Sequence, residues 1–188
     1  NGTTRMKLEQ PPGWAGGEVT FFATATIDGC SVYIEGPADT PKVTHANAQA
    51  VQPTLDVLKE LGIEYEVNVI SAHRTPEKAR QYGLTARSRG IEVIIAAAGG
   101  AAHLPGVLAS WTTLPVIGIP LAGSDLKGTD ALYSIVQMPA GIPVACVAVG
   151  AAGAKNAAYL AAEILGLKHE AIRTAYDKYR ESLQGDKK

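Results

Sequence analysis

Residues Ile91-Glu92-Val93-Ile94-Ile95-Ala96-Ala97-Ala98-Gly99-Gly100 form an apolar run that ends in two glycines. A run of this length, bounded by glycine, predicts a strand that is buried on both faces and turns sharply at its end. Similar runs at 63–70, 115–119 and 144–149 alternate with helical patterns. Because strands that alternate with helices build parallel βαβ units, we predict an α/β fold, a doubly wound parallel sheet of the flavodoxin-like three-layer αβα type.

The helical segments carry their own start and stop signals. Leu55, Leu58 and Leu61 lie on one helical face that ends at Gly62, a residue suited to a helix C-terminus. The triplet Thr75-Pro76-Glu77 predicts a helix start, with Thr75 as its N-cap, and that helix is expected to run to residue 90. Further helices are expected from residue 129, over 151–165, and along the stripe formed by Ile172, Tyr176 and Tyr179.

The first part of the chain predicts an addition to this core. Residues 18–27 and 30–34 are two apolar segments separated by Asp28-Gly29, a pattern typical of a β-hairpin with a type I′ turn. Residues 32–34 are taken as the first strand of the doubly wound sheet. We therefore expect an irregular or hairpin N-terminal extension over residues 1–30 and a single α/β domain over residues 31–188.

Length and composition exclude several classes of protein. The 188 residues suffice for one buried core, and the net charge of −1 gives no electrostatic attraction to nucleic acid or to an anionic membrane. No apolar stretch is long enough to span a membrane. Cys30 and Cys146 are far apart and lack CxxC spacing, which predicts neither a disulfide framework nor a metal site. A cytoplasmic location is expected, and His45 and His169 are expected to be solvated.

Polar and glycine-rich segments follow two of the predicted strands. Ser71-Ala72-His73-Arg74-Thr75-Pro76 combines a hydroxyl, an imidazole and a guanidinium just before a helix N-terminus, which favours an anionic ligand such as phosphate. Residues 98–106, which include Gly99-Gly100 and His103, allow a close approach of the backbone to a ligand. Ligands of such sheets bind beyond the carboxyl ends of the strands, so both loops are expected to border one crevice if their strands are neighbours.

These two motifs, together with Leu132-Tyr133-Ser134-Ile135-Val136-Gln137-Met138-Pro139, resemble the class I N5-carboxyaminoimidazole ribonucleotide mutases of purine biosynthesis. The resemblance extends over roughly residues 52–166, and His103-Leu104-Pro105 is similar to class I rather than to the class II enzymes that carboxylate the ribonucleotide directly. It implies interconversion of N5-carboxyaminoimidazole ribonucleotide and 4-carboxy-5-aminoimidazole ribonucleotide without metal or organic cofactor. The expected partners are this small-molecule substrate, CO₂ and further copies of the chain in a homo-octamer.

The resemblance also implies roles for individual residues. His73 matches the position of the imidazole that acts as general acid and general base. Ser71 and Arg74 match positions that hold the phosphate region of the substrate. The remaining matched positions line the CO₂ and base pocket, and they are Ala98, Gly99, His103 and Leu104.

The sequence departs from the family at the predicted first strand end. The family carries a Gly-Ser-x-Ser-Asp loop there, whereas this chain reads Gly36-Pro37-Ala38-Asp39-Thr40. Gly36 fits the pattern, and Asp39 is our choice, on chemical grounds, for a ligand of the ribose hydroxyls. Thr44 and Asn47 are alternatives. This departure keeps a second function open, a weak or inactive ribonucleotide-binding paralogue. A direct carboxylase that uses CO₂ is a third alternative.

Overall fold

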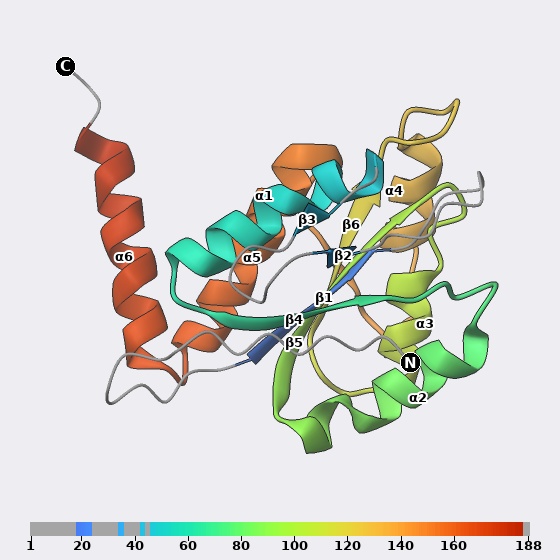
Figure 1. The fold of residues 1–188 in the computed structure, drawn as a ribbon, viewed down its shortest axis with the longest axis horizontal. Helices are drawn as coiled ribbons and strands as arrows, with labels where there is room; N and C mark the ends of the chain where they lie inside the picture. Colours follow the sequence, from blue (N-terminus) through green and yellow to red (C-terminus); the bar gives the residue numbers. More distant parts are fainter. Residues whose placement is uncertain (1–17, 24–33, 36–41, 44–45, 186–188) are drawn as a thin grey trace.

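The computed structural model describes residues 18–23, 34–35, 42–43 and 46–185 of the chain (Figure 1). Its main feature is a five-stranded sheet in the order β4-β1-β5-β6-β7, in which all neighbouring strands are parallel. Numbered by their succession along the chain, these strands lie in the order 2-1-3-4-5 of flavodoxin-like doubly wound sheets, which confirms the predicted fold class. The strands are β1 (Glu18–Ala23), β4 (Glu64–Val69), β5 (Ile91–Gly99), β6 (Val116–Leu121) and β7 (Ala145–Cys146).

The first strand of this sheet lies earlier in the sequence than predicted. β1 has β4 on one side and β5 on the other, so both of its edges are occupied and neither is free for a hairpin partner. Ile34 belongs to β2 (Ile34–Glu35), which pairs antiparallel with β3 (Lys42–Val43) in a separate two-stranded sheet. The predicted hairpin and the predicted first strand at 32–34 are therefore wrong. An Asp-Gly turn signal is local and does not report which strands a neighbouring run pairs with.

Most of the predicted N-terminal extension, residues 1–30, lies outside the described residues, because residues 1–17 and 24–33 are not described. The proposed division of the chain at residue 30 therefore stays a prediction. Where residues of the extension are described, in β1, they form part of the main sheet.

Helices cover both faces of the sheet and produce three layers (Figure 1). One face carries α1 (Ala46–Glu60) and α5 (Gly150–Gly166), and α6 (Glu170–Gly185) packs against α5 at the side of the molecule. None of the described helices is long and apolar enough to cross a membrane. The opposite face carries α2 (Pro76–Ala86), continued by the short 3₁₀ helix η1 (Arg87–Arg89), then α3 (Leu104–Trp111) and α4 (Thr129–Val136).

Alternate residues of the central strands supply the two halves of the core. In β5, Val93, Ile95 and Ala97 face the α1/α5 layer, and Ile94 and Ala96 face the α2/α3/α4 layer; all five side chains are fully buried. A strand buried on both faces reads as a continuous apolar run, which is why this segment was recognisable in the sequence.

The small residues of α5 let that helix pack closely against α1. Its buried face consists of glycine, alanine and one leucine, and the Thr54 hydroxyl on α1 donates a 2.8 Å hydrogen bond to the carbonyl of Ala154 on α5. Thr54 is fully buried, so this bond satisfies a hydroxyl that has no access to water. Pro53 lies within α1, and the helix continues through it.

A second close helix contact joins α2 to α3. Gly83 on α2 is buried, and a Cβ atom at this position would lie 2.6 Å from the Cβ of Trp111 on α3. Since real Cβ atoms do not approach this closely, only glycine permits the observed spacing of the two helices. This spacing matters because the loop before each of these helices carries one of the predicted site histidines.

Glu92, at the start of β5, fixes the connection between α5 and α6. Lys168 Nζ lies 2.6 Å from Glu92 Oε1, and His169 Nε2 lies 2.5 Å from Glu92 Oε2. The side chain of His169 is 10% exposed, so the expectation that this histidine is solvated is wrong. Partial burial by itself raises the pKa of the Glu92 carboxyl, but the hydrogen bonds from Lys168 and His169 outweigh it and hold that pKa below its usual value.

The contact between α2 and α3 predicts the effect of Gly83→Ala. The added methyl group forces the helices apart, at a cost of about 1–3 kcal/mol for overpacking, which outweighs the roughly 1 kcal/mol gained in helix propensity. Chemical denaturation should therefore show a lower free energy of unfolding. The matched control is Gly185→Ala on α6, where nothing lies within 4 Å of the new Cβ and no loss is expected. Equal stability of the two variants would contradict this description of the contact.

The ion pairs of Glu92 predict a pH-dependent contribution to stability. A carboxyl whose pKa is lowered in the folded state stabilises that state above its unfolded pKa of about 4, and the contribution is lost as the pH falls through the folded pKa. At pH 7, Glu92→Gln should lower the free energy of unfolding by about 1 kcal/mol, and this difference should shrink in acid. Glu170→Gln, which removes an exposed pair with Arg173, serves as control and should change stability by less than about 0.5 kcal/mol. A difference for Glu92→Gln that is independent of pH would contradict the assignment.

Candidate functional site

The strand register brings the ends of three strands to one edge of the sheet. Ala23, the last residue of β1, pairs with Val69 of β4 on one side and with Ala97 of β5 on the other. Gly99 of β5 pairs in turn with Leu121, the last residue of β6. β1 and β5 are the strands on either side of the point where the chain reverses its direction of winding, which is where ligands of such sheets bind.

Hydrogen bonds between its two ends hold the loop that follows β4 in shape. The Thr75 hydroxyl donates to the Ser71 carbonyl over 3.0 Å and accepts from the Ser71 amide over 3.1 Å, while the Thr75 amide donates to the same carbonyl over 2.9 Å. The Ser71 hydroxyl accepts from the Arg74 amide over 3.1 Å. Thr75 is the N-cap residue of α2, as predicted, but its hydroxyl closes the loop and makes no capping hydrogen bond to the helix. His73 lies exposed within this closed loop.

The loop that follows β5 leads directly into α3. Gly100 adopts a φ of +60°, a conformation that glycine reaches without strain, and nothing lies within 4 Å of the Cβ that another residue would carry there. His103 is the residue that precedes α3, and its amide donates to the Ala101 carbonyl. The ring of His103 makes no capping hydrogen bond to the helix. It is therefore available for a contact across the edge of the sheet.

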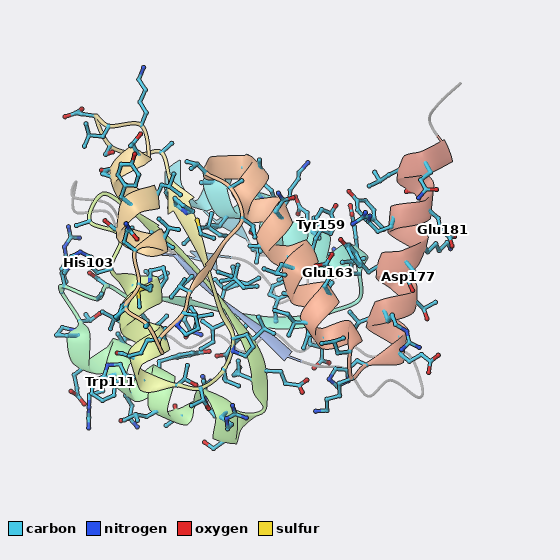
Figure 2. All side chains as sticks on the ribbon, turned by 180° about the vertical axis from the view of Figure 1, so that it is seen from behind. His103, Trp111, Tyr159, Glu163, Asp177 and Glu181 are labelled. Atoms are coloured by element: carbon cyan, nitrogen blue, oxygen red, sulfur yellow. The ribbon has the colours of Figure 1, made fainter. Side chains whose placement is uncertain are left out.

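The two loops meet through their histidines. His73 Nε2 lies 2.8 Å from His103 Nδ1, and the ring centroids are 4.9 Å apart with an angle of 74° between the planes. In Figure 2, His103 marks the end of α3 at this edge of the sheet, and Trp111 marks the opposite end of the same helix. The strands β4 and β5 are not neighbours, because β1 lies between them, so the condition under which the two loops were expected to meet does not hold. The two loops approach each other beyond the end of β1, at Ala23.

The predicted site residues fall into three groups. His73, Arg74 and His103 are exposed and Ser71 is half-buried, all on the two loops just described, and half-buried Gly99 ends β5 at the start of the second loop. Ala98 and Leu104 are almost fully buried beneath the second loop, so their side chains support that loop from below. Gly36 and Asp39 lie outside the described residues, after a strand of the small sheet and not after the first strand of the main sheet.

The loop after β4 also provides a cationic group. The guanidinium of Arg74 makes no hydrogen bond or ion pair with any residue that the structure describes, and it lies two residues before Pro76, the first residue of α2. A helix N-terminus carries free amide groups and partial positive charge. Arginine and a helix N-terminus together favour an anion such as phosphate.

A third loop at the same edge was missed by the sequence prediction. Residues 122–128 follow β6, and since Gly99 pairs with Leu121, this loop begins beside the loop after β5. Its shape is fixed by a 2.9 Å hydrogen bond from Ser124 to Asp130, which holds the pKa of the Asp130 carboxyl below its usual value, and by Gly128 with a φ of +88°. Two glycines, Gly123 and Gly128, within seven residues after a buried strand end were the signal available in the sequence.

This chain is similar to one protein family and to several named relatives. A family model described as AIR carboxylase matches residues 44–186. An N5-carboxyaminoimidazole ribonucleotide mutase from Saccharolobus solfataricus is 55% identical over 136 residues, which are 72% of this chain and 85% of the relative. A protein of the same name from Pseudomonas aeruginosa is 59% identical over 127 residues, 68% of this chain and 78% of the relative.

Solved structures show that known proteins share the fold of this chain. The crystal structure of PurE from Treponema denticola superposes with a TM-score of 0.68 and 24% sequence identity, covering 89% of this chain and 92% of that one. The matched segment 44–186 contains both histidine loops, and it begins after Gly36 and Asp39. On the family match and the two relatives, the chain belongs to the AIR carboxylase family.

Proposed function

We propose that this chain is an isomerase of purine biosynthesis that interconverts N5-carboxyaminoimidazole ribonucleotide and 4-carboxy-5-aminoimidazole ribonucleotide. Relatives that carry this activity in their names are 53–61% identical to it. The observation that supports the proposal within the structure is the position of His73. Its imidazole lies exposed at the carboxyl edge of the sheet, next to the anion-binding features of Ser71, Arg74 and the start of α2.

The reaction moves one carboxyl group from the exocyclic nitrogen to C4 of the ring. It also requires one proton to be donated to the substrate and one to be removed from it. The bond between the exocyclic nitrogen and the carboxyl carbon breaks, CO₂ leaves, and the electron pair that stays on nitrogen takes a proton from His73. The ring carbon C4 then attacks CO₂, and its hydrogen passes as a proton to His73 while the ring regains aromaticity. A single imidazole that acts first as general acid and then as general base balances both steps. No net proton is exchanged with solvent.

The surroundings of His73 suit the other demands of this chemistry. We assign Ser71 and Arg74 to the phosphate region of the ribonucleotide, and Gly99 and His103 to the pocket for CO₂ and the base. The residues that lead into and form the second loop, Gly99, Gly100 and Ala101, are small and not fully buried, which leaves room for CO₂ beside His103. Gly36 and Asp39 remain our proposed contacts to the ribose and phosphate from the beginning of the chain.

A direct carboxylase remains the second candidate, because the matching family model is described as AIR carboxylase. The two activities differ in where CO₂ comes from. A direct carboxylase starts from aminoimidazole ribonucleotide and depends on added bicarbonate or CO₂, whereas the mutase converts the N-carboxylated substrate without it. A ribonucleotide-binding paralogue would bind either compound without turnover.

We expect turnover of N5-carboxyaminoimidazole ribonucleotide without added bicarbonate, and loss of at least about 10²-fold in kcat for His73→Asn, because the amide cannot exchange the proton. Thermal unfolding should be unchanged, since His73 is exposed. The matched control is His169→Asn, which removes an imidazole that is bound to Glu92, a residue at the other end of β5 from Gly99. This control should retain turnover at a temperature where it stays folded. An active His73→Asn variant would exclude the proposed mechanism.

We also propose that the chain assembles into a homo-octamer. The small residues of α5 pack within the chain against α1 and are largely unavailable for contacts between subunits. Another surface supports assembly better: Leu126, Tyr133 and Val136, on α4 and the loop before it, are 64%, 64% and 49% exposed. Exposed apolar side chains grouped on one element are typical of a protein interface.

Light scattering of the purified chain should therefore give the mass of eight subunits. Tyr133→Arg should shift this mass downward, because a charge cannot be buried unpaired in an apolar interface. Leu167→Arg serves as control, since Leu167 is 88% exposed at the turn between α5 and α6. A stable monomer formed by the unaltered chain would rule out the assembly.

A further inference from the structure

The contact between His73 and His103 restricts where protons reside on both rings. A hydrogen bond between two imidazole nitrogens requires one proton between them, on one nitrogen or the other. Because Nε2 of His73 and Nδ1 of His103 are the atoms in contact, at 2.8 Å, Nε2 of His73 is occupied. The nitrogen of His73 that remains for a reacting molecule is therefore Nδ1.

The backbone around both rings is fixed independently of the contact. Ser71 and Thr75 close the first loop by three hydrogen bonds. The backbone of His103 is held on both sides, since its amide donates to Ala101 and its carbonyl accepts from the amide of Val107 over 2.9 Å. Neither ring is packed in the core, as both side chains are exposed. Among the residues that the structure describes, the mutual hydrogen bond is thus the interaction that orients the two rings.

From this geometry, and on the basis of the proposed function, we infer that His103 is a positioning residue for His73. Its Nδ1 accepts the proton of His73 Nε2, which leaves Nδ1 of His73 as an unprotonated nitrogen that accepts the proton from C4. In the acid form, His73 carries protons on both nitrogens, donates the one on Nδ1 to the exocyclic nitrogen of the substrate, and keeps the one on Nε2 in the bond to His103. The same ring nitrogen thus gives and regains the proton, and His103 neither gains nor loses one.

Two substitutions of nearly equal shape separate this role from its alternatives. His103→Asn places an amide oxygen close to the position of Nδ1 and preserves an acceptor for His73 Nε2. His103→Leu branches at the same carbon but has no polar atom. Neither side chain transfers a proton, and neither is expected to disturb the fold, because His103 is exposed.

The test compares kcat and KM for N5-carboxyaminoimidazole ribonucleotide in the unaltered chain and both variants, with thermal unfolding measured on the same samples. We expect His103→Leu to lower kcat by about 10²-fold with little change in KM, because a misplaced general acid–base group forfeits most of its effect. His103→Asn should recover most of this loss. The ¹⁵N shifts of the His73 ring should show a proton on Nε2 in the unaltered chain and in His103→Asn, and a mixture of tautomers in His103→Leu.

Three results would overturn the inference. If both variants keep full activity, the contact does not position His73. If both lose kcat equally, His103 itself exchanges a proton. If KM rises in both while kcat is unchanged, His103 is a contact to the substrate. Failure of the proposed function is a separate outcome, because the unaltered chain would then convert no substrate while the ¹⁵N shifts still report the tautomer of His73.

Discussion

The parallel pairing of β1 with both β4 and β5 is the constraint on which the site depends. Ala23 and Val69 end β1 and β4 level with Ala97, and β5 continues for two more residues to Gly99, so the segments that follow β4 and β5 leave the same edge of the sheet on either side of β1. This register lets the two loops meet beyond the end of β1, where His73 Nε2 lies 2.8 Å from His103 Nδ1. A slip of one residue in either pairing would turn every side chain of that strand to the opposite face.

Small residues in the core allow the close helix packing that supports the two loops. Only 6% of the residues are aromatic, and the core is made chiefly of aliphatic side chains. Gly83 allows α2 and α3, the helices that follow the two histidine loops, to approach each other closely. On the other face of the sheet, the alanines of α5 permit the same close approach to α1. Composition therefore determines helix spacing, and helix spacing supports the relative position of the two loops.

The sequence was most informative where local patterns suffice. Buried runs predicted β4, β5 and β6, and the segment around His73 was correctly expected between a strand end and a helix start. Pairing partners are set by contacts distant in sequence, so β1 was misassigned to a hairpin and Gly36 was placed after a core strand. His169 was expected in solvent for the same reason, because its partner Glu92 lies 77 residues away. The contact between His73 and His103 required the sheet order, which no local pattern contains.

A crystal structure with bound 5-aminoimidazole ribonucleotide would test the placement of the site most directly. The amino group and C4 of the base should lie within about 3 Å and 3.5 Å of Nδ1 of His73, with the phosphate near Arg74 and the start of α2, and with the His73–His103 bond retained. A ribonucleotide bound to the folded chain away from this edge of the sheet would contradict it. The same holds for one bound at this edge with Nε2 of His73 facing the base, since the proposed proton transfer uses the other nitrogen.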